Sequence, residues 1–370
     1  CHMGGELMEE KARLEYVGRS HHKDVLLSGD WEQARPFLEK QVELNRKIAA
    51  AQQEETGQDS AYETLMQNYM PDVCLKKTET LFADYNHALK KMLPKILKKQ
   101  QEREAPLPLS GTYDPQAQMW LNTSLLQVLC FDFTRGGLYQ TGHNPVEGGT
   151  PDDTRLVIKS ADPHNFLSMM KSALHEGGHG LYIQGLPRKT WRYQPVGQDL
   201  GAAMQESQAL LVDMIIGRSR AFFEYLSPRV EGLFHDLGNP ELSAENLYRL
   251  RTNVKQTPVR RYADEVTYFS HIFLRFQMEK ELFDGKLKVA DLPDAWNAKM
   301  QDLVGVRPDN FQDGILQDVH WFVGKFAYFP AYALGHMIAA QFTEKMIADI
   351  GPLDPLVQSG HLSPIKDWLN

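Results

Sequence analysis

The stretch Ser172–Leu186, SALHEGGHGLYIQGL, decides how the rest of the chain is interpreted. It contains His175-Glu176-Gly177-Gly178-His179, an H-E-x-x-H pattern. On an α-helix, residues four apart lie on one face with Cβ atoms about 5–6 Å apart, so two imidazoles can bind one metal ion. Glu176 projects toward the open side of that ion, where it can take a proton from metal-bound water. The spacing therefore predicts a helix that binds a metal ion and carries a base for the metal-bound water.

Apolar residues at helical spacing surround this pattern and predict a buried helix. They are Phe166, Met169, Met170, Ala173, Leu174, Leu181 and Ile183. Gly177 and Gly178 each cost roughly 1 kcal/mol of helix propensity relative to Ala, so we expect a metal and a substrate backbone to approach closely there. The alternative is a chance pattern on a core helix. With 13 His in 370 residues, the chance that an H-E-x-x-H pattern occurs somewhere at random is on the order of a few per cent.

The composition is that of an ordinary globular protein, with 42% hydrophobic and 24% charged residues. A net charge of −8 argues against nucleic acid or an anionic membrane as the main partner. No stretch approaches the ~18 consecutive apolar residues of a transmembrane helix. The three cysteines, Cys1, Cys74 and Cys130, favour reduced thiols in a cytoplasmic protein over a disulfide framework.

Apolar periodicity predicts a mainly helical protein with a single large domain. Cys1-His2-Met3 resembles a cloning remnant, so residues 1–29 are expected to be that remnant and an N-terminal lead-in, with the domain at 30–370. Besides the H-E-x-x-H helix, the expected helices cover 30–53, 60–70, 75–103, 114–133, 200–226, 244–256, 261–283, 293–303 and 328–349. Glycine and proline interrupt 134–163, where 154–159 alternates like a strand. This segment predicts a small antiparallel β element that forms a cleft edge beside the H-E-x-x-H helix.

A catalytic zinc site usually has three protein ligands and an open position for water. Glu206 lies in an apolar run 27 residues after His179, where an unpaired carboxylate is costly to bury and a metal removes that cost. His175, His179 and Glu206 form a set that suits zinc or cobalt. The alternative for Glu206 is an exposed position on the wet face of its helix. Asp213 follows two turns later and either orients a ligand or has only a structural role.

A peptide-cleaving metal site also needs positive charge for a substrate carboxylate and donors for a tetrahedral oxyanion. The candidates are Arg155 on the expected strand, Arg260 at the start of a helix, His320, and the Tyr328–Tyr332 run. Each has an ordinary alternative, because arginines usually form surface ion pairs and aromatic runs usually belong to the core.

Taken together, the motifs resemble the Taq carboxypeptidase-like family of thermostable metallocarboxypeptidases. That family has HPF, DxRxT, HExxH, HES(G)Q, (I/V)RxxAD and GxxQDxHW motifs in this order. The corresponding segments here are His143-Asn-Pro, Asp153-Thr-Arg155-Leu-Val157, His175–His179, Gln205-Glu-Ser-Gln208, Val259–Asp264 and Gly314–Trp321. The resemblance extends from about Trp31 to Leu369.

The resemblance implies a helical enzyme with a deep active-site groove that removes single residues from peptide C-termini. It implies one zinc or cobalt ion per chain, a cytoplasmic homodimer, and peptides with a free C-terminus as substrates. In the implied site, His175, His179 and Glu206 bind the metal and Glu176 is the general base. Arg260 holds the substrate carboxylate, with Arg155 as helper or second candidate. His143 also belongs to substrate binding, while His320 and Tyr328 steady the oxyanion, with Tyr332 as fallback.

This chain departs from the family pattern at Asn144, Val157 and Gln205, none of which is a predicted metal ligand. These departures affect substrate positioning more than the metal site. The family's chains are longer, and we expect that its N-terminal helical section and C-terminal end are not represented, which would widen the groove. The alternatives are an oligopeptidase that cuts short peptides internally and a catalytically silent scaffold that keeps the metal.

Overall fold

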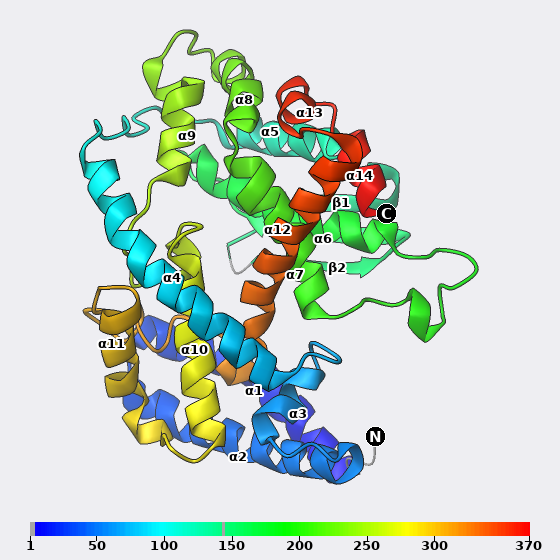
Figure 1. Ribbon diagram of the computed structural model, residues 1–370, viewed down its shortest axis with the longest axis vertical. Helices are drawn as coiled ribbons and strands as arrows, with labels where there is room; N and C mark the ends of the chain where they lie inside the picture. Colours follow the sequence, from blue (N-terminus) through cyan, green and yellow to red (C-terminus); the bar gives the residue numbers. More distant parts are fainter. Residues whose placement is uncertain (1–3, 143–144) are drawn as a thin grey trace. The chain divides into compact units, whose positions relative to one another are not determined.

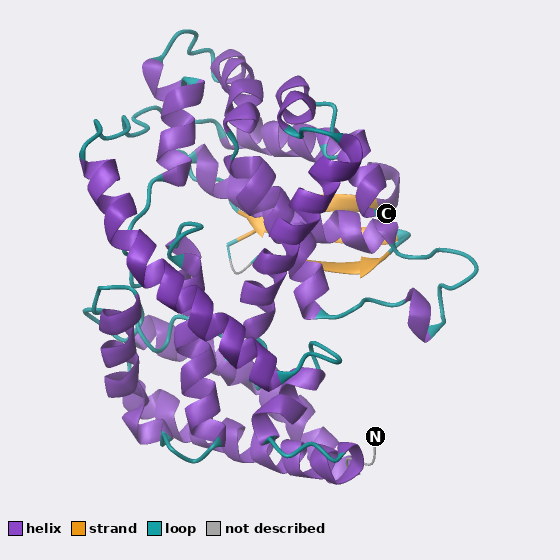
Figure 2. Ribbon diagram, in the orientation of Figure 1, coloured by secondary structure: helices purple, strands orange, loops and turns teal. Residues whose placement is uncertain are grey.

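The computed structural model describes residues 4–142 and 145–370, and over these residues the chain is mainly helical with one three-stranded sheet (Figures 1 and 2). These residues form two compact units. Unit 1 comprises the described residues up to Glu102 together with Val254–Ala333, and unit 2 comprises Arg103–Asn253 and Leu334–Asn370. In the part of the chain that is described, no helix combines the length and the apolar character that crossing a bilayer requires.

Unit 1 is built from helices that pack around aromatic side chains. They are α1 (Gly5–Ser28), α2 (Trp31–Thr56), α3 (Ala61–Gln67), α4 (Leu75–Gln101), α10 (Tyr268–Phe283) and α11 (Leu292–Leu303). Helix α1 ends at Gly29, whose φ of 68° lies in the left-handed region, and Asp30 then caps α2 by accepting hydrogen bonds from the amides of Glu32 and Gln33. The N-terminal lead-in thus contains a helix, with Leu14 and Val25 in the core.

Unit 2 contains the H-E-x-x-H helix and the sheet. Its elements are α5 (Pro115–Val128), β1 (Gly136–Thr141), β2 (Val146–Thr150), β3 (Asp153–Lys159), α6 (Phe166–Gly185), α7 (Ala202–Leu210), α8 (Arg220–Leu233), α9 (Ala244–Thr252), α13 (Asp354–Ser359) and α14 (Ser363–Leu369). Helix α12 (Pro330–Ile350) begins in unit 1 and continues in unit 2.

The sheet has the strand order β1-β3-β2. Strand β2 pairs antiparallel with β3, as the sequence predicts, whereas β1 pairs parallel with β3. Alternate residues of β3, including Leu156 and Ile158, are fully buried. Leu156 meets Gly180 of α6, so this face of the sheet supports the H-E-x-x-H helix.

Two expected helices differ from the structure. The segment 200–226 is not one helix, because α7 ends at Leu210, a π-helical turn covers Leu211–Ile215, and α8 begins at Arg220. Ser219 caps α8 by accepting from the amide of Phe222. The helix expected from residue 261 begins at Tyr268, since Asp264 accepts the amides of Val266 and Thr267 and ends the preceding loop.

Candidate active site

The glycines of the H-E-x-x-H pattern allow α6 to pack closely against its own neighbours in unit 2. A Cβ atom on Gly178 would lie 2.5 Å from the carbonyl oxygen of Gln208 on α7. One on Gly177 would lie 2.4 Å from Leu126 on α5. The expectation that a substrate backbone occupies this space is therefore wrong, because the protein itself fills it. The glycines bring the two ligand-bearing helices together.

His175, His179 and Glu206 lie together in unit 2, with one potential ligand atom from each within 4.8 Å of the others. The Nε2 atoms of His175 and His179 lie 3.8 and 3.9 Å from Glu206 Oε2. A tetrahedral ion with bonds of about 2.1 Å separates its ligands by roughly 3.4 Å, so a small contraction suffices for binding. Glu206 is only 4% exposed and is not on a wet helix face. The donor set fits a divalent metal ion.

Gln205 fixes the orientation of one histidine of the predicted metal-binding set. The Nδ1 atom of His179 lies 2.9 Å from Gln205 Oε1, and an amide oxygen accepts, so Nδ1 donates and Nε2 is available for the metal. Sequence reasoning treated Gln205 only as a departure from the family pattern.

Asp213 lies on the other side of His175, with 3.9 Å between its Oδ2 and Nδ1 of the ring. Its carboxylate pairs with Arg251 at 2.6 Å and is 1% exposed. Burial, and then the neighbouring His179, lower the pKa of His175 to about 3, so the ring is neutral as ligation requires.

Glu176, the predicted base, is buried beside a carboxylate that the sequence did not reveal. Glu147 on β2 pairs in register with Leu156 of β3, so it lies on the sheet face that supports α6. The Glu176 carboxyl donates a hydrogen bond to Glu147. Burial raises the pKa of Glu176 well above its usual value, and the negative charges of Glu147 and Glu206 raise it further. Glu176 therefore retains a proton until positive charge enters the site.

In unit 1, two arginines share a single carboxylate, that of Asp318. Arg260 donates from Nη2 to Asp318 Oδ1 at 2.8 Å, and Arg275 donates from Nε to Asp318 Oδ2 at 2.6 Å. Burial opposes ionisation of Asp318, but the two guanidinium groups hold the pKa of its carboxyl below the usual range. The three side chains together carry one excess positive charge, which favours an anion as a further partner.

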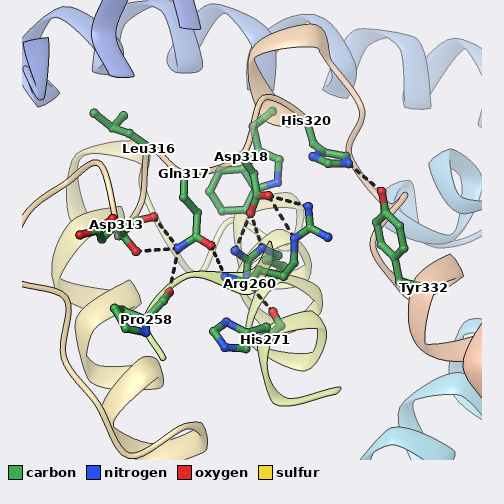
Figure 3. Close-up of polar contacts among 12 residues, drawn as sticks. Pro258, Arg260, His271, Asp313, Leu316, Gln317, Asp318, His320 and Tyr332 are labelled. Atoms are coloured by element: carbon green, nitrogen blue, oxygen red, sulfur yellow. Dashed lines mark hydrogen bonds and ion pairs between the residues drawn. The ribbon is translucent and has the colours of Figure 1, made fainter. Parts of the chain in front are cut away.

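The remaining predicted residues gather beside this cluster in unit 1. The Nε2 atom of His320 lies 3.2 Å from the hydroxyl of Tyr332, a contact that Figure 3 draws. The ring centroids of Tyr328 and Tyr332 are 5.4 Å apart, and the Arg260 guanidinium lies 5.1 Å from the Tyr332 ring centroid. Burial lowers the pKa of His320 to about 3, so this imidazole is neutral and can donate one N–H.

Arg155 lies elsewhere, on β3 of unit 2. Its side chain is 60% exposed and pairs with Asp153, which is the ordinary surface ion pair considered from the sequence. His143 and Asn144 lie outside the described residues. The structure thus gathers the predicted metal ligands with Glu176 in unit 2, and gathers Arg260, His320, Tyr328 and Tyr332 in unit 1.

A helical fold that places a two-histidine, one-glutamate set beside a buried H-E-x-x-H glutamate defines a metallopeptidase. The model of the carboxypeptidase Taq (M32) metallopeptidase family matches residues 1–370. The chain belongs to this family and is a metallocarboxypeptidase that acts on peptides.

Individual relatives agree with this assignment. The chain is 33% identical to thermostable carboxypeptidase 1 of Thermus thermophilus, over 98% of this chain and 71% of the relative. It is 31% identical to carboxypeptidase 1 of Bacillus subtilis, over 92% of this chain and 68% of the relative. Among solved structures, metallocarboxypeptidase 1 of Trypanosoma cruzi superposes with a TM-score of 0.93 at 30% identity, covering 99% of this chain and 73% of that one.

Proposed function

We propose that this carboxypeptidase removes single C-terminal residues with one zinc or cobalt ion held by His175, His179 and Glu206. The observation that carries the proposal is the convergence of these three side chains beside the buried carboxyl of Glu176. Two imidazoles and one carboxylate leave coordination positions for water and substrate. Such an ion, when bound, lowers the pKa of its water and polarises the scissile carbonyl.

Glu176 is proposed to move the proton. Burial and the nearby carboxylates of Glu147, Glu206 and Asp213 raise the pKa of Glu176, and a cation bound beside it would lower that pKa again. In this role the carboxylate takes the proton from the attacking water as the C–O bond forms. It then delivers that proton to the amine nitrogen as the C–N bond breaks. Glu147 accepts a hydrogen bond from Glu176 and so orients its carboxyl.

Arg260 is proposed to bind the free carboxylate of the substrate. Its cluster with Asp318 and Arg275 has one positive charge more than negative charge, and a planar guanidinium can bind a carboxylate through two hydrogen bonds. Arg155 is a weaker candidate, because it is exposed and already paired with Asp153.

His320 and Tyr328 are proposed to donate hydrogen bonds to the oxyanion, with Tyr332 as fallback. A neutral imidazole N–H and a phenol O–H are both donors at neutral pH. The Nδ1 atom of His320 has no hydrogen-bond partner among the described residues, so one ring nitrogen remains for a ligand. A cytoplasmic location and a homodimer also remain proposals, supported by the thiol content and the family.

Cleavage of one short peptide tests the proposal. The metal-free chain is reloaded with zinc or cobalt and incubated with the peptide, free or amidated at its C-terminus, and products are identified by mass spectrometry. Stepwise loss of single residues from the free peptide alone is expected. Internal cuts in both peptides would instead indicate an oligopeptidase, and metal binding without any cleavage would indicate a scaffold.

A further inference from the structure

A buried carboxyl group outside the predicted site contacts both ends of the segment that joins His320 to Tyr328. Glu279 lies on α10 and is fully buried. It accepts three hydrogen bonds: from the Tyr62 hydroxyl at 2.9 Å, from Trp321 Nε1 at 2.6 Å, and from the backbone amide of Ala327 at 3.0 Å. All four residues belong to unit 1.

Two of these donors are sequence neighbours of proposed oxyanion residues. Trp321 directly follows His320, and Ala327 directly precedes Tyr328. The intervening chain is turned back by Gly324, with a φ of 68°. Ala327 itself has a φ of 60°, a conformation that is unfavourable for a residue with a Cβ atom and persists only where surrounding contacts enforce it. The bond from its amide to Glu279 is such a contact.

We infer that Glu279 is a positioning residue that fixes the spacing between His320 and Tyr328 by binding both ends of the segment 321–327. This inference rests on the proposed function, because it concerns the residues assigned there to the oxyanion. Tyr62 on α3 donates to the same carboxyl oxygen as Ala327, so the carboxyl group of α10 is also bound to a second helix. Tyr69 supports the same segment, with its ring 5.1 Å from that of Tyr328 in an edge-on contact.

A glutamine cannot replace this carboxyl group. Trp321 donates to Oε1, whereas Ala327 and Tyr62 donate to Oε2. An amide has one oxygen, so in either orientation its NH₂ group faces a donor and one buried N–H loses its acceptor. Glu279→Gln thus releases one end of the segment while changing almost no volume.

The test compares Glu279→Gln with Glu281→Gln, a matched control on the same helix whose carboxylate pairs with Lys299 near the surface. Below the melting temperature of both variants, Glu279→Gln is expected to lower kcat about 10- to 100-fold, as displacement by about 1 Å does, with little change in KM. Glu281→Gln is expected to match the parent. Trp321→Phe removes only the hydrogen bond from the Trp321 ring to Glu279. This variant is used for the test if Glu279→Gln folds poorly.

A double-mutant cycle with Tyr328→Phe separates positioning from general stability. If Glu279 acts through Tyr328, Glu279→Gln lowers kcat much less in the Tyr328→Phe background than in the parent. Unchanged kcat, or fully additive losses, would overturn the inference. If the parent shows no peptidase activity, the proposed function has failed. Amide hydrogen exchange of Glu279→Gln, compared with the parent, then tests the positioning role. Faster exchange confined to residues 320–328 supports the inference, and an equal change in exchange along the whole chain refutes it.

Discussion

Unit 2 and unit 1 each contain a buried glutamate with a raised pKa, and the two have opposite surroundings. Glu176 in unit 2 faces other carboxylates, Glu147 and Glu206, so its proton is held by negative charge and burial. Glu279 in unit 1 accepts three hydrogen bonds, and burial alone raises its pKa, to about 8. The first arrangement suits a group that exchanges protons, and the second suits a group that holds the chain. Burial by itself does not distinguish a base from an anchor; the neighbours do.

The largest effect that would sharpen this comparison is expected for Glu176→Gln. The amide cannot take up a proton, so turnover should fall by about 10²- to 10⁴-fold, while the three metal ligands stay in place. Steady-state cleavage together with metal content of the purified variant checks this. Normal turnover would show that Glu176 is not the general base. Neither Glu176 nor Glu279 would then be a group that transfers protons.

Arg260→Ala tests whether the excess positive charge of the cluster of Arg260, Asp318 and Arg275 binds the substrate carboxylate. Loss of a charge-assisted pair should lower kcat/KM by about 10- to 100-fold for peptides with a free C-terminus, and much less for amidated ones. Arg155→Ala, which removes an exposed arginine already paired with Asp153, is the control. Equal losses on both kinds of peptide would show that Arg260 stabilises the cluster and does not bind substrate.

Gln205→Ala tests how unit 2 orients the proposed metal ligands. Without the Oε1 acceptor, His179 loses the bond that keeps Nε2 directed at Glu206, and metal affinity should fall by about 10-fold. Competition with a chelator measures this independently of activity. An unchanged Kd would mean that packing of α6 against α7 orients the ring unaided.

The last prediction concerns the pH dependence of stability. Because the folded pKa of Glu279 is about 8 and the ordinary value is 4.5, its contribution to stability is complete below pH 4.5 and is lost as pH rises through 8. The free energy of unfolding of the parent should therefore fall between these values more than that of Glu279→Gln. Denaturant titrations at pH 5, 7 and 9 check the difference. Parallel curves would show that Glu279 is not the titrating group.

Sequence patterns predict the parts of the site that depend on local spacing. The four-residue separation of His175 and His179 places both rings on one helix face, and the apolar run around Glu206 indicates a buried carboxylate, which the structure brings within ligand distance. Most of the helices and the strand at 154–159 follow from periodicity. The break between α7 and α8 does not, because Leu210–Ile216 is apolar throughout except for Asp213.

Contacts between distant parts of the chain leave no such pattern. Tyr62 and Glu279 are 217 positions apart, and Arg275 lies 43 positions before Asp318. Glu147 was obscured by the glycines beside it, although alternation along a strand paired with β3 would have placed it on the α6 side. In the sequence, the Glu–Gly–Gly run indicates a break between elements and gives no sign that its charge lies beside Glu176.

Gly178 has one more consequence, which concerns the kind of ion that the site accepts. Because α6 and α7 are already in backbone contact there, van der Waals radii set the smallest distance between them. A calcium ion needs six to eight oxygen ligands at 2.3–2.6 Å, whereas zinc bonds to imidazole nitrogen at about 2.0–2.1 Å. The contact at Gly178 stops α6 and α7 from coming closer but does not stop them from separating, so the donor atoms decide: two imidazole nitrogens and one carboxylate offer calcium too few oxygen ligands. Millimolar calcium should therefore leave the zinc affinity of the chain unchanged in a competition titration.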